Sequence, residues 1–232
     1  MAAAATKRAV TALSRRPSPR LARPFFSFPS PFGSSSSKTS SSPERRGTLR
    51  KENGAWIYRE DKVMPYSPSQ LYSVIADVDS YQSFLPFTTS SRVLTAARLD
   101  PQGRRLSQPV AEKGWLRGTP GERWEMDGEL RIGAMGFDEG YVSLVEMEKD
   151  KWVKATAKDA TMFRQLSTIW SFSPSTPSEP SAPQTKVDLY LAYAFSSPLH
   201  AAAIQSVWDK VSGLMVEKFE QRVKNVHGPP KR

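Results

Sequence analysis

Few residues in this 232-residue chain are of the types that perform acid–base, nucleophilic or metal chemistry. There is no cysteine, which excludes disulfides, thiolate catalysis and cysteine-based metal sites. The two histidines, His200 and His227, are not at His-x-x-x-His spacing, and the sequence has neither a glycine-rich phosphate loop nor a nucleophile elbow. The acidic residues between Glu122 and Glu129 lie beside a loop, where we expect them to serve solubility. These residues favour binding over catalysis.

Apolar side chains gather in a C-terminal stretch, from about Ser197 to Val226, that predicts one long amphipathic helix. Pro198 suits its first turn, Glu220 and Lys224 make an i,i+4 pair, and the sequence from Gly228 to Pro230 ends it. At about 100° per residue, the apolar residues share one arc roughly 140° wide. They are Ile204, Val207, Trp208, Val211, Leu214, Met215 and Phe219. Such a face cannot remain in water, so upstream elements must cover it.

The upstream sequence predicts a first strand and two short helices. Residues 56–65 have the pattern of a strand. In the sequence 67–70, Ser-Pro-Ser-Gln, the serine and the glutamine are placed to form a capping box, with proline at the first helical position. Asp79 is placed to cap a second short helix that runs to about Leu85 and is stopped by Pro86.

The remaining sequence predicts consecutive antiparallel strands joined by short turns. The residues 138–140 and 149–151 have the composition of hairpin turns. We expect the long polar stretch 101–125 and the proline-rich stretch 174–183 to be mobile surface loops. The predicted strands are Thr89–Leu99, Met126–Phe137, Tyr141–Lys149, Trp152–Asp159, Gln165–Phe172 and Lys186–Ser196.

These elements predict an α+β fold in which a curved antiparallel sheet of six to seven strands wraps around the long C-terminal helix. Two short helices follow the first strand. A helix that bridges the rims of a curved sheet leaves room beneath it, so we expect a hydrophobic tunnel. We assign residues 1–51 to a leader and linker, residues 52–227 to the folded domain and residues 228–232 to a tail.

The charge is unevenly distributed along the chain. Residues 1–51 contain eleven Lys or Arg and one acid, whereas residues 52–232 contain twenty-two of each sign. The neutral domain does not support a broad nucleic-acid surface. Residues 1–43 are rich in Arg and Ser and free of acids, which is typical of a mitochondrial transit peptide, although a disordered basic tail has the same composition. No apolar run approaches the roughly 18 residues needed to span a bilayer, so we expect a soluble or peripheral protein.

Residues 76–87, Ala-Asp-Val-Asp-Ser-Tyr-Gln-Ser-Phe-Leu-Pro-Phe, followed by Ser-Arg-Val at 91–93, resemble the mitochondrial coenzyme Q-binding family. That family has the START-like fold of polyketide cyclases, dehydrases and lipid-transport proteins. The resemblance resumes at 136–141, 159–172 and 195–222, although Phe87-Thr88 replaces the family's usual Trp-Cys. The matching residues of the first part are Tyr72, Asp77, Val78, Tyr81, Phe84, Leu85, Pro86, Ser91, Arg92 and Val93.

The resemblance implies a START-like helix-grip domain that binds coenzyme Q (ubiquinone) in its tunnel and is not an enzyme. It further implies a chaperone or carrier that delivers the quinone for respiratory electron transport and supports its biosynthesis. The implied location is the matrix side of the inner mitochondrial membrane, held peripherally, with coenzyme Q biosynthetic or respiratory complexes as partners. No catalytic cofactor, metal or nucleic acid is expected.

The candidate ligand-binding residues are apolar, and each also has a purely structural interpretation. The residues near Pro86 either end the short helix against the core or form the tunnel entrance, and the strand and helix residues either fill the core or line the cavity. Both interpretations stay open. The candidates are Phe84, Leu85, Phe87, Val93, Trp170, Phe172, Leu191, Val207, Trp208, Val211, Leu214 and Met215.

Four cationic or titratable side chains stand near the apolar residues, and three of them could mark a tunnel mouth. His200, Lys218 and Arg222 fall on the apolar arc of the C-terminal helix, and Arg92 follows the Leu-Pro turn. Solvated helix ends and a surface strand charge explain them without a ligand. In the alternative interpretation Lys218, Arg222 and Arg92 contact lipid headgroups or a quinone oxygen.

Two other functions remain as hypotheses. An enzyme of the cyclase/aromatase branch of the fold would need convergent ionisable side chains inside the pocket. A ribosome-associated interaction protein, resembling bacterial relatives of this family, would need a basic surface that the neutral domain lacks.

Overall fold

The computed structural model describes residues 47–107, 112–134, 137–175 and 183–230. Within these ranges the side chains of residues 134, 137, 159, 199, 200 and 202–213 are not described. The chain divides into two units, Met1–Ser42 and Pro43–Arg232, and every described residue belongs to the second.

Within the described residues, one antiparallel sheet of eight strands has the order β1-β2-β8-β7-β6-β5-β4-β3. Strands β3 to β8 are therefore neighbours in chain order, and β2 joins the sheet beside β8. The chain crosses from β2 to the opposite edge strand β3 through two short helices. The strands are β1 (Thr48–Glu52), β2 (Ala55–Met64), β3 (Thr88–Leu99), β4 (Arg123–Ala134), β5 (Phe137–Glu148), β6 (Trp152–Asp159), β7 (Phe163–Pro174) and β8 (Thr185–Phe195).

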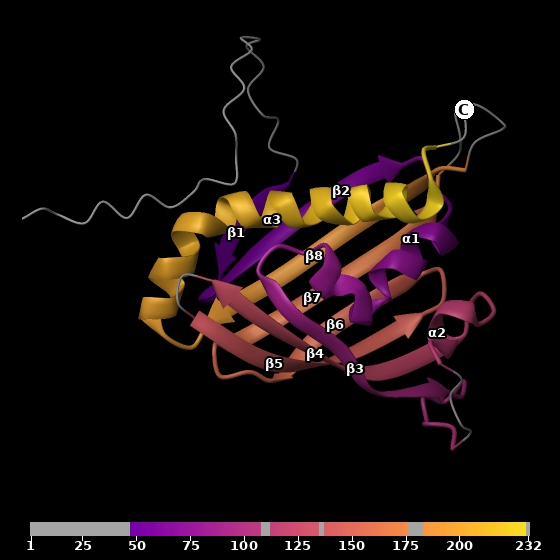
Figure 1. Cartoon of the computed structure of the whole chain (residues 1–232), viewed down its shortest axis with the longest axis horizontal. Helices are drawn as coiled ribbons and strands as arrows, with labels where there is room; N and C mark the ends of the chain where they lie inside the picture. The colour runs from indigo at the N-terminus through magenta and orange to yellow at the C-terminus, as the bar shows by residue number, and fades with distance from the viewer. Residues whose placement is uncertain (1–46, 108–111, 135–136, 176–182, 231–232) are drawn as a thin grey trace, which may run out of the picture. The chain divides into compact units, whose positions relative to one another are not determined.

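The helices are α1 (Pro68–Ile75), the 3₁₀ helix η1 (Val78–Ser83), α2 (Gly114–Arg117) and α3 (Pro198–His227). Figure 1 shows α3 lying along the sheet, with α1 next to its C-terminal half. Phe219 and Val223 of α3 are buried in the core, and Lys62 of β2 makes a 2.5 Å ion pair with Glu220 of α3. The expected pairing partner of Glu220 was Lys224, so this prediction was wrong: the carboxylate instead fastens the helix to the sheet.

The predicted fold class, an antiparallel sheet holding a long C-terminal helix, is confirmed. The sheet has one strand more than the six to seven expected, because β1 lies in the segment that was assigned to the linker. β1 carries the sequence Thr-Leu-Arg-Lys-Glu and is mostly exposed. It is an edge strand held by backbone pairing with β2, such as Lys51 opposite Trp56, and therefore needs no alternating apolar pattern.

The N-terminus of α1 has the predicted capping box. The Ser67 hydroxyl accepts a hydrogen bond from the Gln70 amide (3.3 Å), and the Gln70 side chain accepts one from the Ser67 amide (2.9 Å). Pro68 occupies the first helical position. Asp79 does not cap the second helix: it lies inside η1, and its carboxylate accepts a hydrogen bond from the Val93 amide of β3 (2.7 Å).

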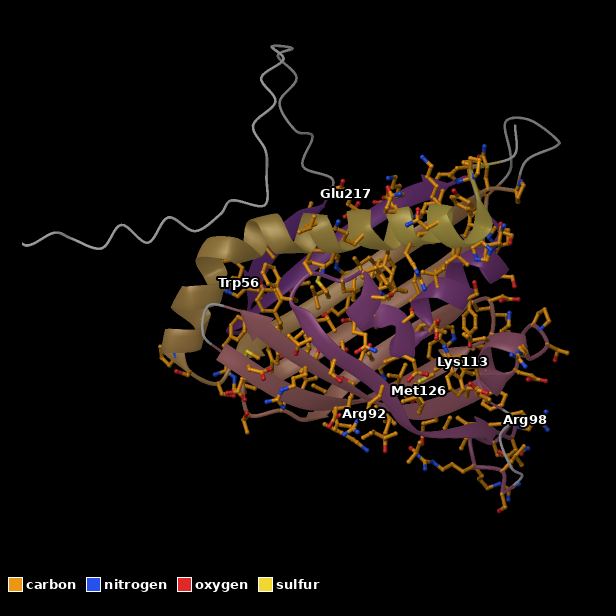
Figure 2. The ribbon with its side chains drawn as sticks, viewed as in Figure 1. Trp56, Arg92, Arg98, Lys113, Met126 and Glu217 are labelled. Atoms are coloured by element: carbon orange, nitrogen blue, oxygen red, sulfur yellow. The ribbon has the colours of Figure 1, made fainter. Side chains whose placement is uncertain are left out.

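The stretch 101–125 is partly folded, which corrects the prediction of a mobile surface loop. Trp115 of α2 is 5% exposed, and its indole donates a hydrogen bond to the Ala76 carbonyl (3.0 Å). Lys113, beside α2 in Figure 2, makes a 2.6 Å ion pair with Asp77. The segment thus holds the junction of α1 and η1 in place through these two contacts. Residues 108–111 of this stretch lie outside the described residues.

The predicted turn at 149–151 is confirmed between β5 and β6, where Asp150 has a φ of +66°. The predicted turn at 138–140 is wrong, because these residues are already part of β5. Most of the predicted loop 174–183, residues 176–182, lies outside the described residues. No helix among the described residues is long and apolar enough to cross a membrane.

Candidate ligand-binding cavity

A cavity of about 260 Å³ lies between the concave face of the sheet and α3. Its walls come from η1 and the following turn, from β2 and β4 to β8, and from the described part of α3. Ligand sites for drug-sized molecules usually span about 300–1,000 Å³, so this volume is just below that range.

The middle of the cavity floor carries small side chains. Ala155 of β6 lies opposite Val145 of β5 and Thr168 of β7, and Ser143 is two residues before Val145 on the same face of β5. All four line the cavity. Because Ala, Ser and Thr fill less space than Leu or Phe, the sheet and the helix cannot close completely over these strands.

The helix η1 forms one side wall. Val78 packs on the sheet at Gly128 of β4, where a Cβ atom would lie 3.3 Å from Val78 Cγ1. The missing side chain therefore lets η1 approach the sheet closely. The hydrogen bond from the Val93 amide to Asp79 fixes η1 to β3. Together these contacts hold Tyr81 over the cavity.

An aromatic cluster closes the inner end. The ring centroid of Phe219 on α3 lies 5.2 Å from Trp170 of β7 and 5.3 Å from Tyr81, with inclined rings. Phe84 lies behind it, 5.3 Å from Phe219, and the Arg222 guanidinium is 5.4 Å from the Phe84 centroid. Inclined aromatic pairs at such separations are attractive, so this end of the cavity has rigid apolar walls.

The outer end is more accessible and lies beside the Pro86-Phe87 turn. Phe87 lines the cavity and is 43% exposed, whereas Phe219 at the inner end is 6% exposed. Phe87 also has a φ of +64°, a conformation that costs a non-glycine residue about 1–2 kcal/mol. Tyr141 and Phe163 also line the cavity, with ring centroids 5.7 Å apart.

No Asp, Glu, Lys, Arg or His is among the described residues that line the cavity. In the part of the chain that the structure describes, no group of three His, Asp or Glu side chains could hold a metal ion. The nearest buried carboxylate is Glu60, which accepts a hydrogen bond from the Tyr58 hydroxyl and borders a second, much smaller cavity of about 20 Å³. The lining that the structure describes is therefore electrically neutral.

The polar side-chain groups among the described lining residues are hydroxyls, and they fall into two sets. Two hydroxyls are engaged, since Tyr58 donates to Glu60 and Tyr81 donates to the Ile75 carbonyl at 2.5 Å. Three others make no hydrogen bond to any residue that the structure describes: Tyr141, Ser143 and Thr168.

Burial shifts the titration of the two phenols nearest η1. Burial raises the pKa of Tyr141 to about 12. It also raises the pKa of Tyr81, with a smaller contribution from the negative charge of Asp77. Both phenols are therefore neutral at physiological pH.

The structure brings five of the sequence-predicted site residues to the cavity: Leu85, Phe87, Trp170, Leu191 and Met215. Phe172 is buried in the core, Phe84 and Val93 pack against that core, and the half-buried Leu214 is not among the lining residues. The side chains of Val207, Trp208 and Val211 lie outside the described ones, although their backbone belongs to α3.

The three predicted mouth residues are placed differently from one another. Arg92 pairs with Glu129 at 2.5 Å and lies, in the view of Figure 2, at the margin of the sheet far from α3. Lys218 is exposed, next to Glu217, which points away from the sheet in Figure 2. Arg222 is half-buried above Phe84 and so backs the aromatic cluster.

Sequence reasoning missed most of the floor of the cavity. The alternation of Tyr141, Ser143 and Val145 along β5 was a usable signal, because residues two apart share a face. Ala155 and Thr168 gave no signal, since a search for apolar bulk passes over small residues.

The sequence pattern of the family described as "Polyketide cyclase / dehydrase and lipid transport" matches residues 64–220 of the chain. A mitochondrial coenzyme Q-binding protein of Schizosaccharomyces pombe is 30% identical over 183 residues, which cover 78% of this chain and 93% of that protein. A mitochondrial coenzyme Q-binding protein of Xenopus laevis is 29% identical over 171 residues, which cover 74% of this chain but only 59% of that protein. The ribosome association toxin of Escherichia coli K12 is 24% identical over 165 residues, 71% of this chain and 85% of the toxin.

Solved structures share the fold. An 18 kDa protein of Caulobacter crescentus is 25% identical, with a TM-score of 0.51, and the match covers 75% of this chain and 99% of that one. A START superfamily protein of Mycobacterium smegmatis gives a TM-score of 0.51 at 12% identity, covering 73% of this chain and 98% of that one. The predicted START-like fold is thus confirmed.

Proposed function

Because the chain belongs to the polyketide cyclase/dehydrase and lipid transport family and, within it, to the coenzyme Q-binding proteins, we propose that its cavity binds coenzyme Q. The protein acts as a carrier or chaperone: it shields the quinone from water without changing it chemically. In this role it delivers coenzyme Q for respiratory electron transport and supports its biosynthesis.

The neutral, apolar cavity beneath α3 is the observation that carries this proposal. A polyprenyl chain gains about 0.8 kcal/mol for each methylene that leaves water, so one five-carbon isoprene unit gains roughly 4 kcal/mol. Charged walls would cancel part of that gain, because a charge loses hydration when an apolar ligand covers it. The absence of charged side chains from the described lining fits a ligand with a long hydrocarbon part.

The aromatic walls suit the quinone ring. Trp170 and Phe219 at the inner end, and Tyr141 and Phe163 at the outer end, present flat rigid surfaces against which a ring can stack. We propose ligand contacts for the five predicted residues that line the cavity, Leu85, Phe87, Trp170, Leu191 and Met215. Phe84, Val93 and Phe172 support the walls from behind.

The volume of about 260 Å³ suits the ring and the first part of the tail better than a complete long polyprenyl chain. The rest of the tail then leaves through the outer end, past the exposed and strained Phe87. We propose that this end meets the membrane, so that the tail stays in lipid while the ring is held. The matrix face of the inner mitochondrial membrane fits the relatives' mitochondrial names and the Arg- and Ser-rich N-terminal sequence.

Two alternatives have less support. A cyclase-type enzyme would need acid–base groups in the cavity, and the described lining offers only phenols and aliphatic hydroxyls, with the pKa values of Tyr81 and Tyr141 raised. A ribosome-binding role, suggested by the likeness to the toxin, would need a basic face, but residues 52–232 carry equal numbers of positive and negative side chains.

Transfer between membranes tests the carrier role. Donor vesicles that contain ubiquinone are mixed with acceptor vesicles that lack it, and the quinone content of the separated acceptors is followed with and without the full-length protein. We expect transfer to accelerate in proportion to protein concentration. Unchanged transfer, together with no binding of a short-chain ubiquinone, would refute the proposal. Binding without transfer would limit the role to that of a chaperone.

A further inference from the structure

Of the three phenols on the described cavity wall, that of Tyr141 has a proton that it donates to no described residue. Its neighbours on the lining, Tyr58 and Tyr81, already donate their protons to Glu60 and to the Ile75 carbonyl. The Tyr141 hydroxyl makes no hydrogen bond to any residue among those described, although the ring packs against Phe163 at 5.7 Å. A phenylalanine would fill the same space without a polar group.

The Tyr141 side chain is half-buried, and its hydroxyl is open to the cavity rather than enclosed by other protein atoms. Polar groups in protein interiors nearly always have hydrogen-bond partners, so a hydroxyl placed here calls for an acceptor inside the cavity. Burial raises the pKa of Tyr141 to about 12, so the phenol keeps its proton at physiological pH and is available as a donor. A ligand that places an acceptor at this point would give the hydroxyl its partner.

We infer that the Tyr141 hydroxyl donates a hydrogen bond to a ring oxygen of the bound quinone, and that this contact selects an oxygen-bearing ring over a plain hydrocarbon. The inference rests on the proposed function and deepens it by naming the contact that recognises the ring. It places the ring against Tyr141 and Phe163. Ser143, two residues further along the same face of β5, offers a second donor beside the first.

The chemistry of the site supports this selection. A quinone carbonyl oxygen accepts hydrogen bonds but carries no charge, so it matches a neutral phenol in an uncharged cavity. A carboxylate ligand such as a fatty acid would need a cation, and no Lys, Arg or His is among the described lining residues. A hydrocarbon would leave the Tyr141 hydroxyl unpaired.

The test compares two ligands and three proteins. The ligands are decylubiquinone and decylbenzene, which share the ten-carbon chain but differ in their ring oxygens. The full-length proteins are the wild type, Tyr141→Phe, and the matched control Tyr66→Phe, whose hydroxyl donates to the Gly228 carbonyl (3.0 Å) and is not part of the cavity lining. Dissociation constants are measured by titration calorimetry, and urea unfolding confirms that each variant is folded.

We expect Tyr141→Phe to weaken decylubiquinone binding about fivefold, the loss of one net hydrogen bond, and to leave decylbenzene binding unchanged or tighter. Tyr66→Phe should alter neither. Equal weakening for both ligands, or unchanged binding of both, would overturn the inference while leaving quinone binding itself intact. A wild type that binds decylbenzene but not decylubiquinone would overturn the proposed function, and the inference with it.

Discussion

Replacement of Ala155 by leucine tests whether the ligand occupies the cavity beneath α3. Ala155 lies at the middle of the floor, between Val145 and Thr168, where the sheet carries small side chains. Leucine adds three carbon atoms at this point. Because the space is already empty, we expect the free energy of unfolding to stay the same or to rise, whereas an addition to a filled core usually costs about 1–3 kcal/mol.

The added leucine side chain occupies space that the ligand would otherwise fill, so the ligand loses apolar contacts there. Displacing three carbon atoms' worth of apolar contact costs about 2.4 kcal/mol at 0.8 kcal/mol each, which corresponds to a roughly 50-fold increase in the dissociation constant. The constant is measured by calorimetric titration with a short-chain ubiquinone, and stability by urea unfolding.

Thr156→Leu is the matched control for this experiment. Thr156 is the next residue of β6, and successive side chains of a strand point to opposite faces of the sheet. We expect the Thr156→Leu variant to bind quinone with the same affinity as the wild type. If Ala155→Leu is folded and binds quinone within about threefold of the wild type, the ligand does not occupy this cavity. If it is destabilised by several kcal/mol, the floor of the cavity is not empty space.

Four further outcomes follow from the structure. Trp115→Ala should lower the free energy of unfolding by about 3–5 kcal/mol in urea, because the indole is buried and bonds to the Ala76 carbonyl; a loss below 1 kcal/mol would mean that α2 does not support the fold. Ser67→Ala should cost about 1 kcal/mol by removing the helix cap, and an unchanged urea midpoint would contradict the capping geometry. Phe87→Gly should relieve the +64° backbone and keep or raise the urea midpoint, but weaken binding of ubiquinone-containing vesicles in a flotation assay; undiminished vesicle binding would remove Phe87 from the proposed membrane contact. The contribution of Tyr141 to stability should be constant below about pH 10 and be lost toward pH 12, because the unfolded state loses the phenol proton before the folded state does; Tyr141→Phe should reduce the fall in stability above pH 10.

The main elements of the fold could be predicted because their local signals agree with the tertiary structure. The alternation along β8 matches its burial on the concave side, with Val187, Leu189 and Tyr193 all below 9% exposed. The Ser67 and Gln70 caps form as their spacing indicates. In both cases the residues that give the signal are the residues that make the contact.

The misses have a common physical cause, since each depends on a partner distant in the sequence. Asp79 has the type and position of a helix cap, but the amide of Val93 on β3 binds it instead. Glu220 makes its ion pair with Lys62 of β2 and not with a residue of its own helix. Trp115 lies in a polar stretch with the composition of a loop, and its indole is held by the Ala76 carbonyl between α1 and η1, which the local sequence does not show.

The cavity was the least predictable part of the structure. Large apolar residues such as Trp170 and Met215 were found from the sequence, because bulk at regular spacing is visible. The space itself is made by small residues, Ala155, Ser143 and Thr168, whose effect depends on what lies opposite them. Small residues of this kind give no periodic apolar pattern from which a cavity could be predicted.

The most direct test of quinone binding is lipid extraction and mass spectrometry of the full-length protein purified from a host that makes ubiquinone. Ala155→Leu, purified in the same way, is the control for lipid carried over nonspecifically. We predict close to one ubiquinone per wild-type protein and much less in the variant. A wild-type protein that carries no ubiquinone and also fails to bind it when it is added would contradict the central claim.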